Sequence, residues 1–136
     1  MIKWGIVGLG NMGQKFANAI AETSNSKLTG AASLDKNKVK NFKENYTLNE
    51  IIAYDNYDEI IKDENVDAIY IATLNNTHFH LIKKCTEYKK NILCEKPFTL
   101  NYDEGREVYD YVLKNDVIFY EGFAYRSHPQ TKIVQE

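Results

Sequence analysis

The sequence predicts an α/β fold in which helices cover both faces of a parallel sheet. Short apolar segments alternate with amphipathic segments along the whole chain, and the loops between them are short. Residues 66–72 are almost continuously apolar, which is typical of a central parallel strand buried on both faces. A glycine-rich turn joins the first strand to the first helix. Together these features predict a doubly wound sheet of the Rossmann type, in three layers α/β/α with right-handed crossovers.

Length and composition predict one domain of ordinary globular character. The chain has 136 residues, of which 43% are hydrophobic and 26% are charged, and this is enough for one core. A net charge of −2 with interspersed signs gives no general attraction to nucleic acid or membranes. The chain begins with a strand instead of a leader, and no apolar run approaches the roughly 20 residues that cross a bilayer. Cys85 and Cys94 follow no metal or disulfide spacing, so we expect both thiols to be reduced and the protein to be cytoplasmic.

The strands and helices are expected to alternate strictly. Apolar segments predict strands at residues 2–7, 27–34, 51–54, 66–72, 91–94 and 117–120. The first helix is predicted over residues 12–22. Apolar stripes at helical spacing mark the others: Val39 and Phe42; Tyr57, Ile60 and Ile61; Leu81, Ile82, Cys85 and Tyr88; and Val108, Tyr109 and Val112. Asp55 or Asn56 is expected to cap the helix around residues 57–61.

The glycine-rich turn has the pattern G-x-G-x-x-G. Gly8 allows the tight turn out of the strand, Gly10 lets the backbone approach a diphosphate, and Gly13 lets the helix pack closely on the strand. A diphosphate would lie against the first N–H groups of the helix, beside Asn11 and Met12. The pattern therefore predicts a dinucleotide site, and the alternative is a glycine-rich turn that binds nothing.

An acidic residue stands near the place where a dinucleotide ribose is expected. Asp35 closes the second strand, 22 residues after Gly13, and an acid near this position accepts hydrogen bonds from the adenosine ribose of NAD. The same residue could instead cap the helix that begins at Lys36. Lys36 and Lys38 could equally attract the 2′-phosphate of NADP. The sequence therefore favours NAD slightly and leaves the choice open.

Polar and unusual residues gather after the strands. Ligands of a doubly wound sheet bind beyond the carboxyl ends of the strands, and five loops of this chain carry candidates there. Beyond the glycine loop and Asp35, the candidates are Thr73, Asn75 and His78, then Glu95, Lys96 and Pro97, then Glu121, Tyr125, Arg126 and His128. His78 and His80 are two residues apart and would face different sides of a helix, so no metal site is predicted.

These motifs resemble those of the Gfo/Idh/MocA oxidoreductases. The similarity lies in residues 8–13, 72–78, 94–97 and 125–129, in the order and spacing of that family. It implies an NAD(P)-dependent dehydrogenase acting mostly on sugars, cyclitols and related polyols. The Glu-Lys-Pro sequence after a strand is its most specific part. Leu74 departs from the family, because many members carry proline there, and the loop that passes the nicotinamide ribose is expected to be less rigid.

The resemblance implies that Lys96 is the catalytic lysine. It would hydrogen-bond the substrate hydroxyl, help to move its proton, and contact the cofactor. Pro97 can take the cis bond that would aim Lys96 inward. Without the resemblance, Glu-Lys-Pro is more often an exposed turn. Glu95 would hold the cofactor or orient Lys96, and its alternative is an acid that only flanks a helix.

The resemblance also implies roles for residues in the neighbouring loops. Thr73, Asn75 and His78 are candidate cofactor residues, the latter two as ribose contacts or as residues that position the loop. His78 could instead be a first-turn histidine satisfied within the protein. Tyr125 and Arg126 are substrate-side candidates. The planar fork of Arg126 can anchor polar groups, and a salt bridge is its alternative.

The resemblance divides the chain unequally. Residues 1–122 would form the NAD(P)-binding domain, and residues 123–136 would begin a linker helix toward a second domain that carries most of the substrate pocket. The full-length protein is expected to be a homo-oligomer acting on a small molecule. The isolated chain is expected to bind the cofactor weakly and to turn over nothing. The alternative is a non-catalytic dinucleotide-binding module for redox sensing or scaffolding.

Overall fold

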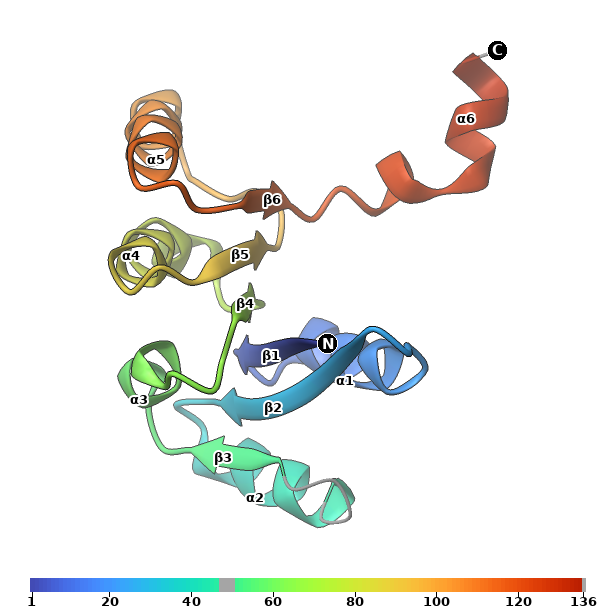
Figure 1. The fold of residues 1–136 in the computed structure, drawn as a ribbon, viewed down its shortest axis with the longest axis vertical. Coiled ribbons are helices and arrows are strands. Elements are labelled where there is room, and N and C mark those ends of the chain that lie inside the picture. Colours follow the sequence, from blue (N-terminus) through green and yellow to red (C-terminus); the bar gives the residue numbers. More distant parts are fainter. Residues whose placement is uncertain (47–50, 136) are drawn as a thin grey trace.

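A six-stranded parallel sheet forms the centre of the molecule (Figure 1). The computed structural model describes residues 1–46 and 51–135. The strands are β1 (Ile2–Val7), β2 (Ser26–Ala32), β3 (Ile52–Tyr54), β4 (Ala68–Ile71), β5 (Asn91–Cys94) and β6 (Phe119–Glu121). They lie in the order β3-β2-β1-β4-β5-β6, and every neighbouring pair is parallel. The predicted doubly wound sheet is confirmed, and the winding reverses between β1 and β4.

Helices cover both faces of this sheet. They are α1 (Asn11–Ala21), α2 (Lys36–Asn45), α3 (Tyr57–Lys62), α4 (Asn75–Glu87), α5 (Tyr102–Lys114) and α6 (Pro129–Gln135), with a short 3₁₀ helix η2 (Ala124–Ser127) before the last. In Figure 1, α1 and α2 lie on one side of the sheet and α3, α4 and α5 on the other, which gives the expected three layers. The final helix α6 projects beyond β6, away from the sheet (Figure 1).

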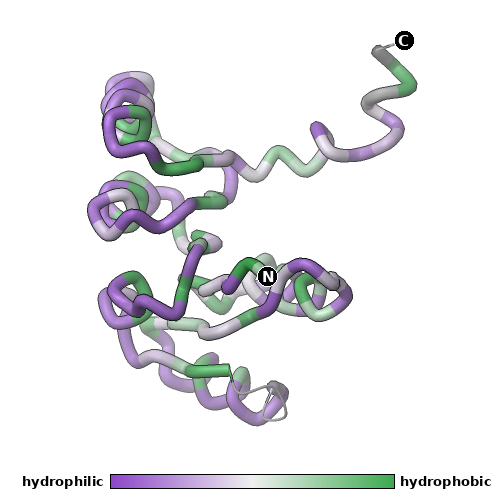
Figure 2. The backbone as a smooth tube through the Cα atoms, viewed as in Figure 1, coloured by the Kyte–Doolittle hydropathy of each residue, from purple (hydrophilic) through white to green (hydrophobic). Residues whose placement is uncertain are grey.

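Each face of the sheet has its own apolar core. On one face, Ile61, Ile82 and Val108 from α3, α4 and α5 are fully buried. On the other face, Ala17 and Phe42 from α1 and α2 pack in a second cluster with residues of β1 and β2. Figure 2 shows hydrophilic residues along the outer sides of the helices. All four residues of β4 are buried, which confirms a central strand apolar on both faces.

Side chains at the helix starts settle several alternatives. Asn56 caps α3, where its Oδ1 accepts from the Glu59 N–H at 3.0 Å. Asp35 caps α2, which is one of the two roles expected for it.

Both cysteines are free and buried, Cys85 on α4 and Cys94 at the end of β5.

Two expected stripes are wrong in part, and the strand limits differ. Tyr88, expected on one face with Leu81, Ile82 and Cys85, is 38% exposed and lies at the C-cap of α4. Val108 and Val112 of α5 are buried, but Tyr109 is 60% exposed. Each helical residue turns by about 100°, so the residue next to Val108 faces away from the sheet. Strand β6 begins at Phe119 instead of residue 117, and β2 ends at Ala32 instead of residue 34. Among the described helices, none is both long enough and apolar enough to cross a membrane.

Candidate functional site

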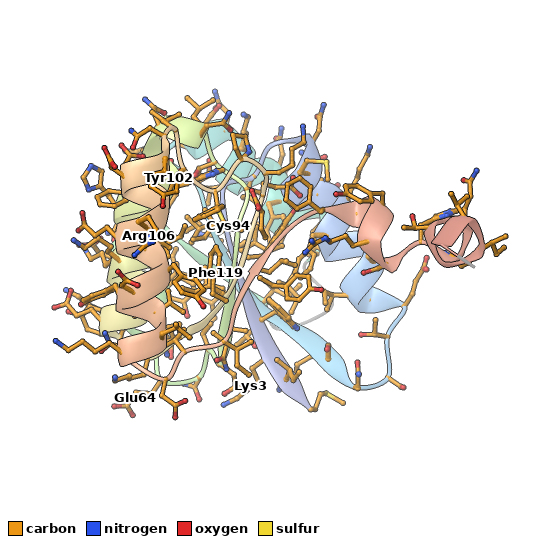
Figure 3. All side chains as sticks on the ribbon, turned by 90° about the horizontal axis from the view of Figure 1, so that it is seen from above. Lys3, Glu64, Cys94, Tyr102, Arg106 and Phe119 are labelled. Carbon is orange, nitrogen blue, oxygen red and sulfur yellow. The ribbon has the colours of Figure 1, made fainter. Side chains whose placement is uncertain are left out.

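An open cleft of about 760 Å³ lies where the strand order reverses, beyond the carboxyl ends of β1, β4, β5 and β6. It is lined by residues of four loops: Gly10, Asn11, Met12, Ala72, Thr73, Asn75, Glu95, Lys96, Gly122, Phe123, Ala124 and Tyr125. In Figure 3, Cys94 marks the carboxyl end of β5 near this edge, and Lys3 lies toward the opposite end of the sheet. The glycine loop and Lys96 therefore open onto one cleft, as expected from the sequence.

The three glycines of the first loop meet different surroundings. Gly8 has a φ of 101°, and a Cβ there would lie 2.5 Å from the Ala72 carbonyl oxygen. A Cβ at Gly13 would lie 2.1 Å from the Gly8 carbonyl oxygen. At Gly10 a Cβ would meet nothing within 4 Å. The turn thus requires glycine at positions 8 and 13, where a Cβ would clash, whereas the missing Cβ of Gly10 leaves open space at the cleft.

Helix α1 begins at this space without a side-chain cap. Its N-cap is Gly10, which has no side chain to accept from the first N–H groups of the helix. Uncapped donors and the positive end of the helix dipole converge on this point, and both favour a bound anion. The fit for a diphosphate therefore rests on the open space at Gly10 and on the uncapped helix start.

The loop after β4 is held by threonine hydroxyls. Thr77 Oγ1 donates to the Leu74 carbonyl oxygen at 2.7 Å, so its one proton is used there. Thr73 Oγ1 lies 2.7 Å from Thr77 Oγ1 and is then the donor of that pair. Asn75 opens α4 with an exposed side chain on the cleft. Thr73 and Asn75 are thus presented by a loop that two hydrogen bonds hold in place.

The loop after β5 carries Lys96 into the cleft. Lys96 is exposed, and the peptide bond to Pro97 is cis, as the sequence allowed. Before it, the Glu95 N–H donates to the Ile71 carbonyl at 2.9 Å. After it, the Phe98 N–H donates to Glu121 Oε1 at 3.1 Å. The loop is therefore tied on one side to β4 and on the other to β6.

Glu95 accepts a hydrogen bond from a buried tyrosine of the neighbouring strand β4. Tyr70 of β4, which is 3% exposed, donates its hydroxyl to Glu95 Oε1 at 2.5 Å. Burial, followed by the bond to Glu95, raises the pKa of the Tyr70 phenol far above its ordinary value. Tyr70 thus remains a donor, and Glu95 is fixed in the cleft wall instead of being a free acid beside a helix. No sequence pattern predicts this contact between Tyr70 and Glu95.

His78 does not reach the cleft. Its side chain is fully buried, with Nδ1 2.9 Å from the Pro97 carbonyl oxygen and Nε2 3.2 Å from the Thr73 carbonyl oxygen. Both ring nitrogens are turned toward backbone carbonyls inside the protein, which agrees with a histidine that positions loops and with one that is satisfied within the protein. A direct contact between His78 and a cofactor stays a prediction.

Asp35 lies outside the cleft lining, at the start of α2. Its Oδ1 accepts from the N–H groups of Asn37 at 2.9 Å and Lys38 at 3.3 Å. Ser33, directly after β2, is buried and accepts from the Asp35 N–H at 3.2 Å. Lys36 and Lys38 are exposed beside it. The carboxylate thus caps α2, and its contact with a ribose stays a prediction.

The segment after β6 is the fourth segment that lines the cleft. Tyr125 lines the cleft, and the Arg126 guanidinium lies over the Phe123 ring at 5.9 Å. Within residues 1–46 and 51–135, Arg126 makes no ion pair, and the salt bridge expected as its alternative stays a prediction. Among the described residues, its neighbour is an aromatic face. Gly122, Phe123 and Ala124 also line the cleft, and the sequence did not single them out.

Metal binding has no support in the described ranges. No group of three or more His, Cys, Asp or Glu side chains able to hold an ion occurs among the residues that the structure describes.

Known dehydrogenases are similar over nearly all of this chain. A trans-1,2-dihydrobenzene-1,2-diol dehydrogenase of Xenopus tropicalis is 32% identical over 93% of the chain and 38% of its own length. A myo-inositol 2-dehydrogenase of Thermotoga maritima is 30% identical over 97% of the chain and 39% of its own length. The crystal structure of a probable dehydrogenase from Thermotoga maritima, 30% identical, superposes with a TM-score of 0.86 over 92% of this chain and 37% of that one.

The chain thus spans less than half the length of these relatives. Residues 2–123 match the sequence model described as the oxidoreductase family with an NAD-binding Rossmann fold. The chain is a cofactor-binding domain of the Gfo/Idh/MocA family, to which it belongs.

Proposed function

We propose that this domain serves a dehydrogenase that oxidises a hydroxyl group of a sugar, cyclitol or related polyol with NAD(P). The observation that carries the proposal is the shared cleft, onto which both Gly10 and Lys96 open. The relatives named above are dehydrogenases of a diol and of an inositol, which supports this substrate class. Residues 1–122 are proposed as the NAD(P)-binding domain and residues 123–136 as the start of a linker.

The residues of the cleft divide the work between binding and proton movement. The N–H groups at the start of α1, beside Gly10, Asn11 and Met12, would hold the diphosphate. Thr73 and Asn75 would contact the nicotinamide ribose. When bound, the nicotinamide supplies the hydride acceptor.

Lys96 would move the proton of the reacting hydroxyl. Its amine is exposed in the cleft, where it can hydrogen-bond a substrate oxygen and accept or return the proton. Glu95 would orient Lys96 or accept hydrogen bonds from the cofactor. Tyr125 and Arg126 would contact the substrate from the segment after β6. His78 would act only through the loops that it touches.

For the cofactor we propose NAD ahead of NADP. The exposed carboxylate of Asp35 can accept from a ribose 2′-hydroxyl and would repel a 2′-phosphate. Lys36 and Lys38 act in the opposite direction. A D-xylose dehydrogenase of Haloferax volcanii, 30% identical over 98% of the chain and 40% of its own length, carries NADP(+) in its name, so both forms belong in the test.

We further propose that the rest of the substrate pocket lies in a second domain, as the greater length of the relatives suggests. The substrate would be a small molecule, and the longer form would be a homo-oligomer. Alone, the chain would bind NAD(P) weakly and turn over no substrate, because it supplies only one side of the site and the second domain would supply the other. The free thiols support a reducing compartment such as the cytoplasm.

The direct test is a titration of the ¹⁵N-labelled chain with NAD and, separately, with NADP. The expected result is a set of amide shifts confined to the loops of the cleft, with the tighter binding for NAD. Tighter binding of NADP would overturn the cofactor order alone. If neither dinucleotide shifts the amides of residues 10–12 at millimolar concentration, the proposed cofactor site is wrong.

A further inference from the structure

Lys96 lies between two residues that are each tethered by a buried side chain. On its amino side, Glu95 receives the hydroxyl of Tyr70. On its carboxyl side, the carbonyl oxygen of Pro97 faces Nδ1 of His78. Tyr70 is 3% exposed and His78 is fully buried, so water competes little with either bond. Both tethers come from the unit formed by β4 and α4, which also supplies the opposite loop of the cleft.

Tyr70 is held on its far side as well. Its ring stacks on Phe16 of α1, with centroids 4.1 Å apart and an angle of 26° between the planes. Phe16 in turn meets the edge of Trp4 at 5.1 Å. The phenol therefore has little freedom to rotate away, and its oxygen is a fixed point against which the Glu95 carboxylate is placed.

His78 connects the two loops that face each other across the cleft. One ring nitrogen lies by Pro97 and the other by the carbonyl of Thr73. Carbonyl oxygens only accept, so a neutral ring donates to one of them at a time. Either bond fixes a cleft loop to α4, and the ring fills the space between both loops.

Backbone bonds do not hold Lys96 itself. The Glu95 N–H is bonded to β4 and the Phe98 N–H to Glu121. Between these points, the described part of the chain gives the Lys96 N–H and carbonyl no hydrogen bond, and Pro97 has no N–H to offer. The contacts of Tyr70 with Glu95 and of His78 with Pro97 therefore restrain the residues on either side of Lys96.

We propose that Tyr70 and His78 are positioning residues that set where Lys96 presents its amine in the cleft. This inference rests on the proposed function, because it concerns the nicotinamide end of the same site. Tyr70 acts through Glu95 and His78 acts through Pro97. Neither touches a ligand.

The test compares two ligands that share one end. NAD and ADP-ribose both carry the diphosphate, but only NAD carries a nicotinamide, which in the proposed site would lie beside residues 95–97. In Tyr70→Phe the stack on Phe16 remains and the bond to Glu95 is lost. We expect the NAD affinity to fall about 3- to 10-fold, the range of one lost hydrogen bond, and the ADP-ribose affinity to stay within about twofold.

Tyr54→Phe is the matched control. Tyr54 also donates its hydroxyl to a carboxylate, that of Asp63, but neither residue lines the cleft. This variant loses the same kind of bond, so it should leave both affinities unchanged. A merely structural role for Tyr70 would make the two variants alike in ligand binding, and that result would overturn the proposal for Tyr70.

Two amide substitutions test His78. An asparagine amide nitrogen takes the place of Nδ1, and a glutamine amide nitrogen that of Nε2. His78→Asn should therefore keep the bond to Pro97 and most of the NAD affinity. His78→Gln should lose this bond, and its affinity should fall for NAD but not for ADP-ribose. Equal behaviour of the two variants, or parallel loss of ADP-ribose binding, would overturn this half. Failure of the unmodified chain to bind NAD, NADP or ADP-ribose would instead refute the proposed function.

Discussion

At the scale of single residues, the glycine loop separates folding from binding. A Cβ at Gly13 would collide with a backbone oxygen that cannot move without moving the turn, whereas a Cβ at Gly10 would enter open space. The backbone at Gly10, with φ −78° and ψ −171°, is one that alanine adopts readily. The sequence pattern treats the two glycines alike, but their surroundings predict different consequences of the same substitution.

Gly10→Ala should fold normally and bind the dinucleotide poorly. We expect the free energy of unfolding to change by less than about 0.5 kcal/mol, because no atom opposes the new methyl group. Binding should fall by about tenfold or more, since the methyl group stands where the diphosphate approaches the helix. Urea unfolding and NAD titration measure the two effects. Gly13→Ala is the contrast, with an expected loss of about 2 kcal/mol or more of stability.

Asp35 can be tested for its two tasks separately. Asp35→Asn keeps an oxygen that caps α2 but removes the charge. Its stability should stay near that of the unmodified chain, and its preference should shift toward NADP if the carboxylate faces the ribose. Asp35→Ala should lose about 1 kcal/mol of stability with the cap. An unchanged ratio of NAD to NADP affinity in Asp35→Asn would leave Asp35 with the capping role alone.

At the scale of elements, features that depend on neighbouring residues could be predicted from the sequence, whereas contacts between distant segments could not. The apolar run at β4 and the cap of α3 depend on neighbours in sequence. The sequence predicts the first and narrows the second to Asp55 or Asn56, of which Asn56 is the cap. Tyr109 was misplaced because a stripe of three apolar residues does not say which of two adjacent ones faces the sheet. The contact between Tyr70 and Glu95 joins residues 25 apart. It exists because β4 and β5 pair with Ile71 beside Cys94, a register that periodicity alone does not provide.

The connection between α3 and β4 predicts how stability depends on pH. A hydrogen bond from Tyr54, followed by the N–H of Asn65, lowers the pKa of Asp63 below its ordinary value. A carboxyl whose pKa is lower in the folded state stabilises it above the unfolded pKa, near 4, and loses this effect as the pH falls through the folded pKa. The free energy of unfolding should therefore decline as the solution is acidified below about pH 4.

Tyr54→Phe should reduce this decline, because the largest cause of the lowered pKa is removed. Urea unfolding of both proteins between pH 2 and pH 6 measures it. The two stabilities should differ most near neutral pH and approach each other in acid. A difference that is the same at every pH would show that the Asp63 carboxylate is not the titrating group.

At the scale of the whole molecule, the site follows from the reversal of the winding. β1 and β4 are neighbours although the described elements α1, β2, α2, β3 and α3 separate them in sequence. Their loops, together with those of β5 and β6, meet in one cleft, and the motifs predicted that meeting because parallel strands end at a common edge. Gly122, Phe123 and Ala124 were not predicted. They carry no chemical signature, and only the path of the chain after β6 brings them to the cleft.

The enzyme proposal is tested by Lys96→Ala in a longer form of the protein that includes the second domain. If Lys96 moves the proton, kcat should fall by about 10² or more, while NAD affinity should fall by no more than about 10-fold, because the diphosphate is still held by α1. Lys83→Ala is the matched control: Lys83 pairs with Glu107 outside the cleft lining, and its loss should leave kcat unchanged. The two lysines differ in place and not in charge, so a selective effect of Lys96 locates the chemistry in the cleft. An unchanged kcat in Lys96→Ala would favour a domain that binds the dinucleotide without proton transfer from this residue.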